Sequence, residues 1–139
     1  MNLEQEDRTG LIIGAAIEVH RNLGPGFLES VYENALSLEL AHREIPFVNQ
    51  VTVPIRYRES VVGTHILDLF VEDQIVVELK AVSHLQDIHY VVLRSYLKAA
   101  GREHGLLLNF ATPTLQIKRV STRTRLDLCS FPGFLASFS

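Results

Sequence analysis

The sequence lacks tryptophan and contains a single cysteine, Cys129, among its 139 residues. A lone cysteine excludes an intramolecular disulfide, and the six histidines show no paired metal-ligand spacing with it, so a zinc site is not expected. Residues 2–8 are polar and acid-rich and have no apolar run of the kind found in secretory signals. We therefore expect a protein of the reducing cytoplasm.

Long apolar runs and a strong excess of one charge are also missing. The longest apolar candidates, such as residues 105–110, have the length of a strand, whereas a membrane-spanning helix needs about 20 apolar residues. No contact with a membrane is expected. The formal charge of −3 gives no overall attraction to a polyanion. Contact with nucleic acid would therefore require a local basic patch or bound cations.

The chain does have the composition of an ordinary folded protein, with 47% hydrophobic and 21% charged residues. Its length predicts a single domain over residues 1–139, with a core from about residue 10 to 120. Residues 121–139 form a tail whose pattern is not defined. Its aromatic residues could cover the core or a subunit interface; they are Phe131, Phe134 and Phe138.

Two amphipathic helices are predicted at the start of the chain. The first helix ends where Gly24 and Pro25 break its pattern. Pro25 suits the start of a second helix, which runs to about His42. The apolar residues at helical spacing in the first helix are Leu11, Ile12, Ala15, Ala16 and Val19.

The pattern then changes to that of β-strands. Alternation of β-branched and polar residues from Phe47 predicts a first strand, in which Pro54 favours an edge position. Two further strands, over residues 64–71 and 74–81, are joined by a tight turn at Glu72-Asp73. These three strands form a meander.

A helix and two strands complete the predicted fold. Ser83 and Gln86 have the spacing of a capping box, which predicts a third helix that ends at Gly101. The residues expected on its inward face are Ile88, Val91, Val92 and Ser95 or Tyr96. Residues 106–110 predict a buried strand parallel to the third strand, and residues 115–120 predict an edge strand. The result is an α/β fold with a mixed sheet flanked by helices.

Three charged residues interrupt the apolar strands. Glu78 and Lys80 are two residues apart and leave the same face of a strand, and the turn brings Asp68 level with Glu78. Burying such charges costs several kcal/mol unless they are paired or bind a cation. An ion-pair cluster would satisfy them. So would Mg²⁺ or Mn²⁺, bound by both carboxylates, a backbone carbonyl and water, with Lys80 orienting a water for phosphodiester hydrolysis.

These residues resemble two known motifs. Asp68 followed by Glu78-Leu79-Lys80 is similar to the PD-(D/E)xK nuclease signature. Residues 26–32, Gly-Phe-Leu-Glu-Ser-Val-Tyr, are similar to the motif that names the GxxExxY proteins. The similarity runs from about residue 10 to residue 120. It implies a restriction-endonuclease-like core with the element order ααβββαββ.

The resemblance also implies roles for individual residues. Asp68 and Glu78, with the backbone carbonyl of Leu79, would be metal ligands, and Lys80 would be the catalytic lysine. Glu29 would be the additional helical carboxylate that some members use, although an acid in the first turn of a helix is also favoured by the helix dipole. On the third helix, Tyr96 matches the tyrosine of a Gln-x-x-x-Tyr motif. Val92 stands where that motif has glutamine.

Two further side chains are candidates for contacts around this site. Tyr32 lies on the same helical face as Glu29, so its hydroxyl group could hold that carboxylate or its ring could fill the core. His20 could face the site from the end of the first helix or act as a favourable charge at that helix end.

These observations predict a metal-dependent nuclease that acts on DNA, or on RNA, in DNA repair or processing. The alternative is an inactive module that keeps the nuclease fold and binds nucleic acid or protein, which Val92 and the acidic net charge favour. A homodimer is expected only because two-fold dimers are the commonest oligomers of soluble proteins. One basic cluster could contact a phosphate backbone or be an ordinary solvated surface; it consists of Lys118, Arg119, Arg123 and Arg125.

Overall fold

The computed structural model describes residues 3–123 of the chain. Its elements are α1 (Leu3–Leu23), α2 (Glu29–His42), β1 (Phe47–Tyr57), β2 (Ser60–Val71), β3 (Ile75–Lys80), α3 (Asp87–Ala100), β4 (His104–Asn109) and β5 (Gln116–Ser121). The predicted order ααβββαββ is therefore confirmed. Predictions for the aromatic tail and for Arg125 lie outside the described residues. No helix in the described part of the chain is long and apolar enough to cross a membrane.

The strands form a mixed sheet with the order β1-β2-β3-β4-β5. Neighbouring strands are antiparallel except β3 and β4, which are parallel and are joined through α3. This is the predicted crossover, because parallel neighbours need a long connection. Pro54 lies in the edge strand β1, where the missing proline N–H costs no ladder hydrogen bond.

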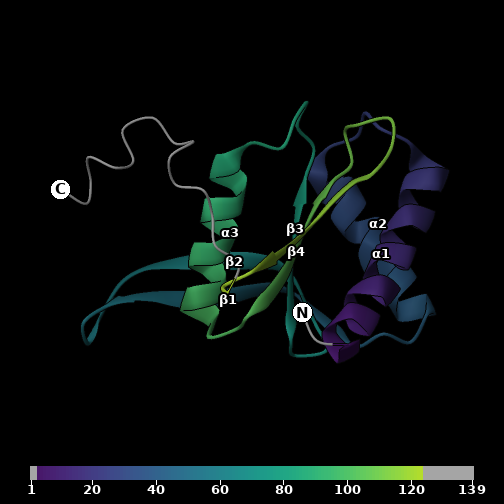
Figure 1. The fold of residues 1–139 in the computed structure, drawn as a ribbon. Helices are drawn as coiled ribbons and strands as arrows, with labels where there is room; N and C mark the ends of the chain where they lie inside the picture. Colours follow the sequence, from purple (N-terminus) through teal and green to yellow (C-terminus); the bar gives the residue numbers. More distant parts are fainter. Residues whose placement is uncertain (1–2, 124–139) are drawn as a thin grey trace.

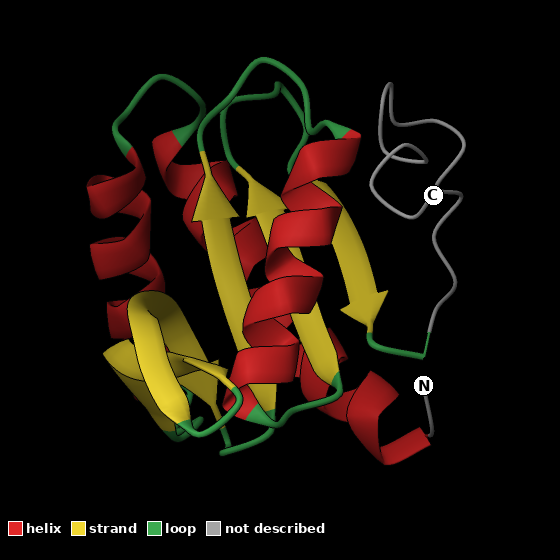
Figure 2. Cartoon of the chain, turned by 90° about the vertical axis from the view of Figure 1, so that its left-hand side faces the viewer, coloured by secondary structure: helices red, strands yellow, loops and turns green. Residues whose placement is uncertain are grey.

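The sheet is the middle of three layers. Helices α1 and α2 lie on one side of it and α3 lies on the other (Figures 1 and 2). Val77 and Leu79 of β3 belong to the apolar cluster that includes residues of α1 and α2. Val76, which precedes Val77 and points to the opposite face, belongs to the cluster that includes Leu93 and Leu97 of α3. Both faces of β3 are thus buried, as expected for a central strand.

Two predicted helix starts were wrong. Helix α2 begins at Glu29, not at Pro25, because Gly24 and Gly26 adopt φ values of 69° and 115° in the connecting loop. Helical backbone cannot contain such angles. Helix α3 begins at Asp87, so Ser83 is not its N-cap residue. The N-cap residue is Gln86, three positions later.

The cap of α3 is formed by Gln86 and His89. The backbone N–H of Gln86 donates to Nδ1 of His89 at 2.9 Å, and the N–H of His89 donates to the carbonyl of Gln86 at 2.9 Å. A histidine three residues after the N-cap thus performs the task usually assigned to glutamate or glutamine. At the other end Gly101, with φ 67°, terminates the helix as predicted.

The inward face of α3 also differs from the prediction. Leu93 and Leu97 are its buried residues, whereas Ile88 is 51% exposed and Ser95 is exposed. The buried face is set by the close approach of the helix to β4. A Cβ atom at Gly105 would lie only 3.1 Å from the carbonyl oxygen of Val76 and 3.3 Å from a methyl carbon of Leu93. Glycine at this position therefore lets the helix and strand meet.

Candidate functional site

At Asp68, the alternation of side chains between the two faces of the sheet is interrupted in strand β2. Pairing between β1 and β2 omits the position where Gln50 would oppose Asp68, and Gln50 has a left-handed backbone with φ 53°. Leu69 packs in the cluster beneath α1 and α2, but Leu67 packs in the cluster beneath α3. In a regular strand, residues two apart share one face. The irregularity at Gln50 therefore coincides with a change in the facing of β2.

The pairing of β2 with β3 ends at the same place. The last pair of this ladder is Leu69 opposite Val77, so a continued register would place Asp68 opposite Glu78. Instead, the N–H of Leu79 donates to Oδ2 of Asp68 at 3.0 Å. A side-chain carboxylate thus satisfies a backbone donor where the two strands separate. This arrangement brings the carboxylates of Asp68 and Glu78 together.

Both carboxylates have raised pKa values. Glu78 is 6% exposed, and burial together with repulsion from Asp68 raises its pKa to about 8, although Lys80 and a hydrogen bond from the Asp68 backbone oppose the shift. Burial also raises the pKa of Asp68, against the Leu79 hydrogen bond and the charge of Lys80. A site that keeps a proton on a carboxylate near neutral pH is one that favours added positive charge.

His65 belongs to this site although the sequence did not indicate it. Its Nε2 atom lies 3.7 Å from Oε1 of Glu78, and neither atom has a hydrogen-bond partner within residues 3–123. The imidazole ring stacks on Tyr96, with ring centroids 3.3 Å apart and an interplanar angle of 10°. Burial lowers the pKa of His65, while the charge of Asp68 opposes the shift. The neutral ring therefore presents a nitrogen to Glu78.

A small cavity opens beside Glu78. Its volume is about 70 Å³, and its lining residues are Glu78, Lys80, His89, Val92, Leu93 and Leu107. This volume has room for a few water molecules. Lys80 and Glu78, two residues apart in β3, therefore line the same small cavity. Val92, which replaces the glutamine of the resembled motif, contributes a hydrocarbon wall without a hydrogen-bonding group.

Acidic residues of α2 approach the site from the other side of the sheet. Glu29 is exposed at the first residue of the helix, and its charge contributes to the raised pKa values of both Asp68 and Glu78. Glu33, one turn later, accepts two hydrogen bonds from Nε2 of Gln50, at 2.8 and 2.9 Å. Burial raises the pKa of Glu33, with Gln50 opposing and Asp68 adding to the shift.

Glu33 was not anticipated, although its position four residues after Glu29 places both acids on one helical face. Within residues 3–123, no three Asp, Glu, His or Cys side chains lie close enough to hold one metal ion. Glu29 therefore does not join Asp68 and Glu78 as a third ligand in this conformation. Its contribution here is electrostatic.

Tyr32 and His20 hold loops in this structure. The hydroxyl group of Tyr32 donates to the carbonyl oxygen of Gly24 at 2.6 Å and accepts the N–H of Phe27 at 3.1 Å. Its one proton is thus used on the loop between α1 and α2 and not on Glu29. Nε2 of His20 lies 2.9 Å from the carbonyl oxygen of Thr112, in the loop after β4.

The donor atoms of the site fit a divalent cation. Asp68 and Glu78 are both oxygen donors, and Oε1 of Glu78 has no hydrogen-bond partner among the described residues. Burial raises both pKa values, and the charge of Asp68 adds to the rise at Glu78. Mg²⁺ characteristically binds one or two carboxylates and completes its shell with water and substrate phosphates. Two converging carboxylates beside a water-sized cavity suit that mode of binding better than a closed protein cage.

The fold and this site define an α/β protein with two acidic residues and a lysine gathered where the two inner strands β2 and β3 separate. A family model for the PD-(D/E)XK nuclease superfamily matches residues 6–120. The chain belongs to that superfamily, whose nucleases generally use divalent metal ions.

A solved structure described as the crystal structure of SSO0001 has a similar fold, with a TM-score of 0.55 and 16% sequence identity. The match covers 78% of this chain and 55% of that one, so this chain spans about half the length of that protein. At this identity the likeness concerns the fold alone. No match to a curated protein sequence was found.

Proposed function

We propose that this protein is a divalent-metal-dependent nuclease that hydrolyses phosphodiester bonds of DNA, or of RNA. The observation that carries the proposal is the convergence of Asp68 and Glu78 where β2 leaves β3, with Lys80 on the same face as Glu78. Membership of a nuclease superfamily supports the reaction class. The small cavity beside Glu78 and Lys80 supports a place for the attacking water.

Asp68, Glu78 and the backbone carbonyl of Leu79 would hold Mg²⁺ or Mn²⁺. The bound ion would supply neutralisation of the charge that develops on the phosphodiester and a lowered pKa for water. Lys80 would hold the attacking water and donate to a phosphate oxygen through its ammonium group. Glu29, exposed at the start of α2, would contribute negative charge and, after a movement of its side chain, a further oxygen ligand.

Residues around the cluster would position these groups. His65 presents Nε2 to Glu78, and its ring is fixed by stacking on Tyr96. A hydrogen bond between this nitrogen and Glu78, which the 3.7 Å separation does not form, would orient the carboxylate as a metal ligand and tune its basicity. The resemblance of residues 26–32 to the GxxExxY motif supports a role for Glu29 as a further metal ligand. Tyr32 stabilises the loop that precedes α2.

The second candidate is a non-catalytic nucleic-acid-binding module that keeps the fold. One observation favours it: Val92 lines the cavity at the position where the resembled motif has glutamine. A hydrocarbon side chain there offers no hydrogen bond to a phosphate or water. This candidate predicts binding of nucleic acid without turnover.

A cleavage assay separates the two candidates. Labelled single-stranded and double-stranded DNA and RNA are incubated with the protein and Mg²⁺ or Mn²⁺. We expect cleavage that falls by about a hundredfold or more in Asp68→Ala and in Lys80→Ala, because each removes a group from the reacting centre. Arg21→Ala, at an exposed position of α1, is the control for loss of a positive charge outside the site. Activity that survives both site substitutions would reject this site, and binding without any cleavage would favour the second candidate.

A further inference from the structure

A second concave region lies between β1 and α3. It is a cleft of about 420 Å³ lined by Pro54, Ile55, Arg56, Ser95, Lys98 and Ala99. The hairpin of β1 and β2 extends beyond the rest of the sheet and passes alongside α3 (Figure 1). The cleft is therefore formed by the part of β1 near the hairpin turn and the C-terminal half of a helix.

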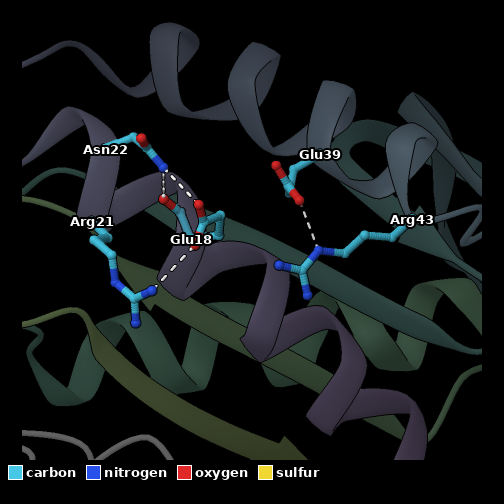
Figure 3. Close-up of polar contacts among 5 residues, drawn as sticks. All are labelled: Glu18, Arg21, Asn22, Glu39 and Arg43. Atoms are coloured by element: carbon cyan, nitrogen blue, oxygen red, sulfur yellow. Dashed lines mark hydrogen bonds and ion pairs between the residues drawn. The ribbon is translucent and has the colours of Figure 1, made fainter.

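The two cations of this cleft have no partners in the described part of the chain. Among residues 3–123, neither the guanidinium group of Arg56 nor the ammonium group of Lys98 has an ion-pair or hydrogen-bond partner. By contrast, Arg21 and Arg43 in the α1–α2 layer each pair with a glutamate three or four residues earlier, at 3.4 and 2.7 Å (Figure 3). The cleft thus offers positive charge that is not neutralised by neighbouring carboxylates, in a protein whose net charge is −3.

The cleft is adjacent to the candidate metal site. Tyr96 lies next to Ser95 in α3 and stacks on His65, whose Nε2 atom is 3.7 Å from Glu78. Val92, which lines the small cavity, and Ala99, which lines the cleft, are seven residues apart on the same helix. Seven residues make two helical turns, or about 10 Å, and return to the same face. One face of α3 therefore leads from the cavity to the cleft, past the His65–Tyr96 stack.

We propose that this cleft binds the phosphate backbone of the nucleic-acid strand that is cut, with Arg56 and Lys98 contacting phosphates beside the scissile bond. The inference rests on the proposed function and adds the surface that holds the substrate. Two acidic residues at the reacting centre repel a polyanion, so substrate affinity has to come from cations outside it. At the tip of the same hairpin, the exposed Tyr57 ring lies 5.6 Å from the guanidinium carbon of Arg58 and extends this surface.

The test measures binding separately from cleavage. Affinities for a short fluorescent single-stranded oligonucleotide and its duplex are measured by anisotropy in EDTA, over a series of salt concentrations. The variants are the double substitution Arg56→Gln with Lys98→Gln, the charge-preserving pair Arg56→Lys with Lys98→Arg, and the control Arg21→Gln in α1. Arg21 is exposed like Lys98 but lies on the other side of the sheet, where it pairs with Glu18. Circular dichroism and the melting temperature establish that each variant is folded.

We expect the glutamine pair to bind about tenfold or more weakly, and its dependence of log affinity on log salt to be shallower by about 0.7–0.9 for each lost phosphate contact. The charge-preserving pair and Arg21→Gln should stay within about twofold of the wild type. Unchanged affinity and salt dependence in the glutamine pair would overturn the inference, as would the absence of any binding by the wild-type protein.

The outcomes for this inference and for the proposed function are distinguishable. Binding that depends on Arg56 and Lys98 without any metal-dependent cleavage would support the cleft and reject the nuclease. Cleavage that depends on Lys80 but is indifferent to the glutamine pair, in both binding and KM, would support the nuclease and reject the cleft. An oligonucleotide that is displaced by an apolar peptide but not by salt would also count against a phosphate-binding role.

Discussion

The two faces of β3 are at the same depth in the molecule but have opposite chemistry. Towards α1 and α2 the strand presents Ile75, Val77 and Leu79, all apolar and at most 1% exposed. On the alternating positions Val76 is followed by Glu78 and Lys80. The first face is what burial of hydrocarbon favours. The second face carries charge where burial makes charge costly, and we therefore assign the proposed metal-dependent hydrolysis to that face.

The largest effect expected from this comparison is on the apolar face. Leu79→Ala removes a buried side chain and leaves a cavity beneath α1 and α2, so we expect the free energy of unfolding to fall by about 2–5 kcal/mol. Urea denaturation measures the change. Leu38→Ala is the control, because Leu38 is 74% exposed and its loss should cost less than about 0.5 kcal/mol. Equal losses in the two variants would contradict a tightly packed apolar face.

On the charged face, replacing a buried side chain should raise the stability of the protein and not lower it. Burial raises the pKa of Glu78 from its ordinary value of 4.5 to about 8, so between pH 4.5 and pH 8 the folded protein keeps a proton that the unfolded chain has lost. The stability that depends on this proton is complete below pH 4.5 and is lost as the pH rises through about 8. Glu78→Gln, which stays neutral, should therefore be more stable than the wild type at pH 8, by up to a few kcal/mol.

Denaturation in EDTA at pH 5 and pH 8 tests this reversal. The variant and the wild type should be close at pH 5 and diverge at pH 8, because protonated glutamate and glutamine are similar in shape and charge. Glu44→Gln, at an exposed position, should show no such divergence. A wild-type protein that is equally or more stable than Glu78→Gln at pH 8 would contradict the cost assigned to this carboxylate.

A smaller effect is expected at Tyr32, which belongs to the α1–α2 side. Tyr32→Phe leaves the carbonyl of Gly24 and the N–H of Phe27 without their hydroxyl partner, which should cost about 1 kcal/mol. Affinity for Mn²⁺ should remain within about twofold of the wild type. Thermal unfolding and calorimetric titration measure the two quantities. A large loss of Mn²⁺ affinity with little loss of stability would instead assign Tyr32 to the site.

Much of the fold was predictable because it depends on local patterns. The apolar run of β4 and the helix before it predicted a parallel neighbour for β3, since a central parallel strand is buried on both faces. The turn at Glu72-Asp73, with φ values of 52° and 55°, set the register that brings Asp68 towards Glu78. Here counting residues from the turn was sufficient.

His65 was missed because its position depends on a tertiary irregularity. It is three residues before Asp68, and alternation in a regular strand would place the two on opposite faces. The face change of β2, opposite the left-handed Gln50, brings them to the same site. Left-handed backbone at a glutamine is uncommon and has no reliable sequence signal. The buried face of α3 was likewise missed because it depends on the contact with Gly105.

The central claim is that Asp68 and Glu78 are held together to bind a divalent cation, and titration calorimetry with Mn²⁺ tests it most directly. The account predicts saturable binding of one ion per chain, lost in Asp68→Asn and in Glu78→Gln and unchanged in Glu44→Gln. Binding should strengthen between pH 6 and pH 8, because the ion displaces the proton retained by Glu78. Mn²⁺ affinity that is the same in all four proteins, or no binding by the wild type at pH 8, would contradict the account.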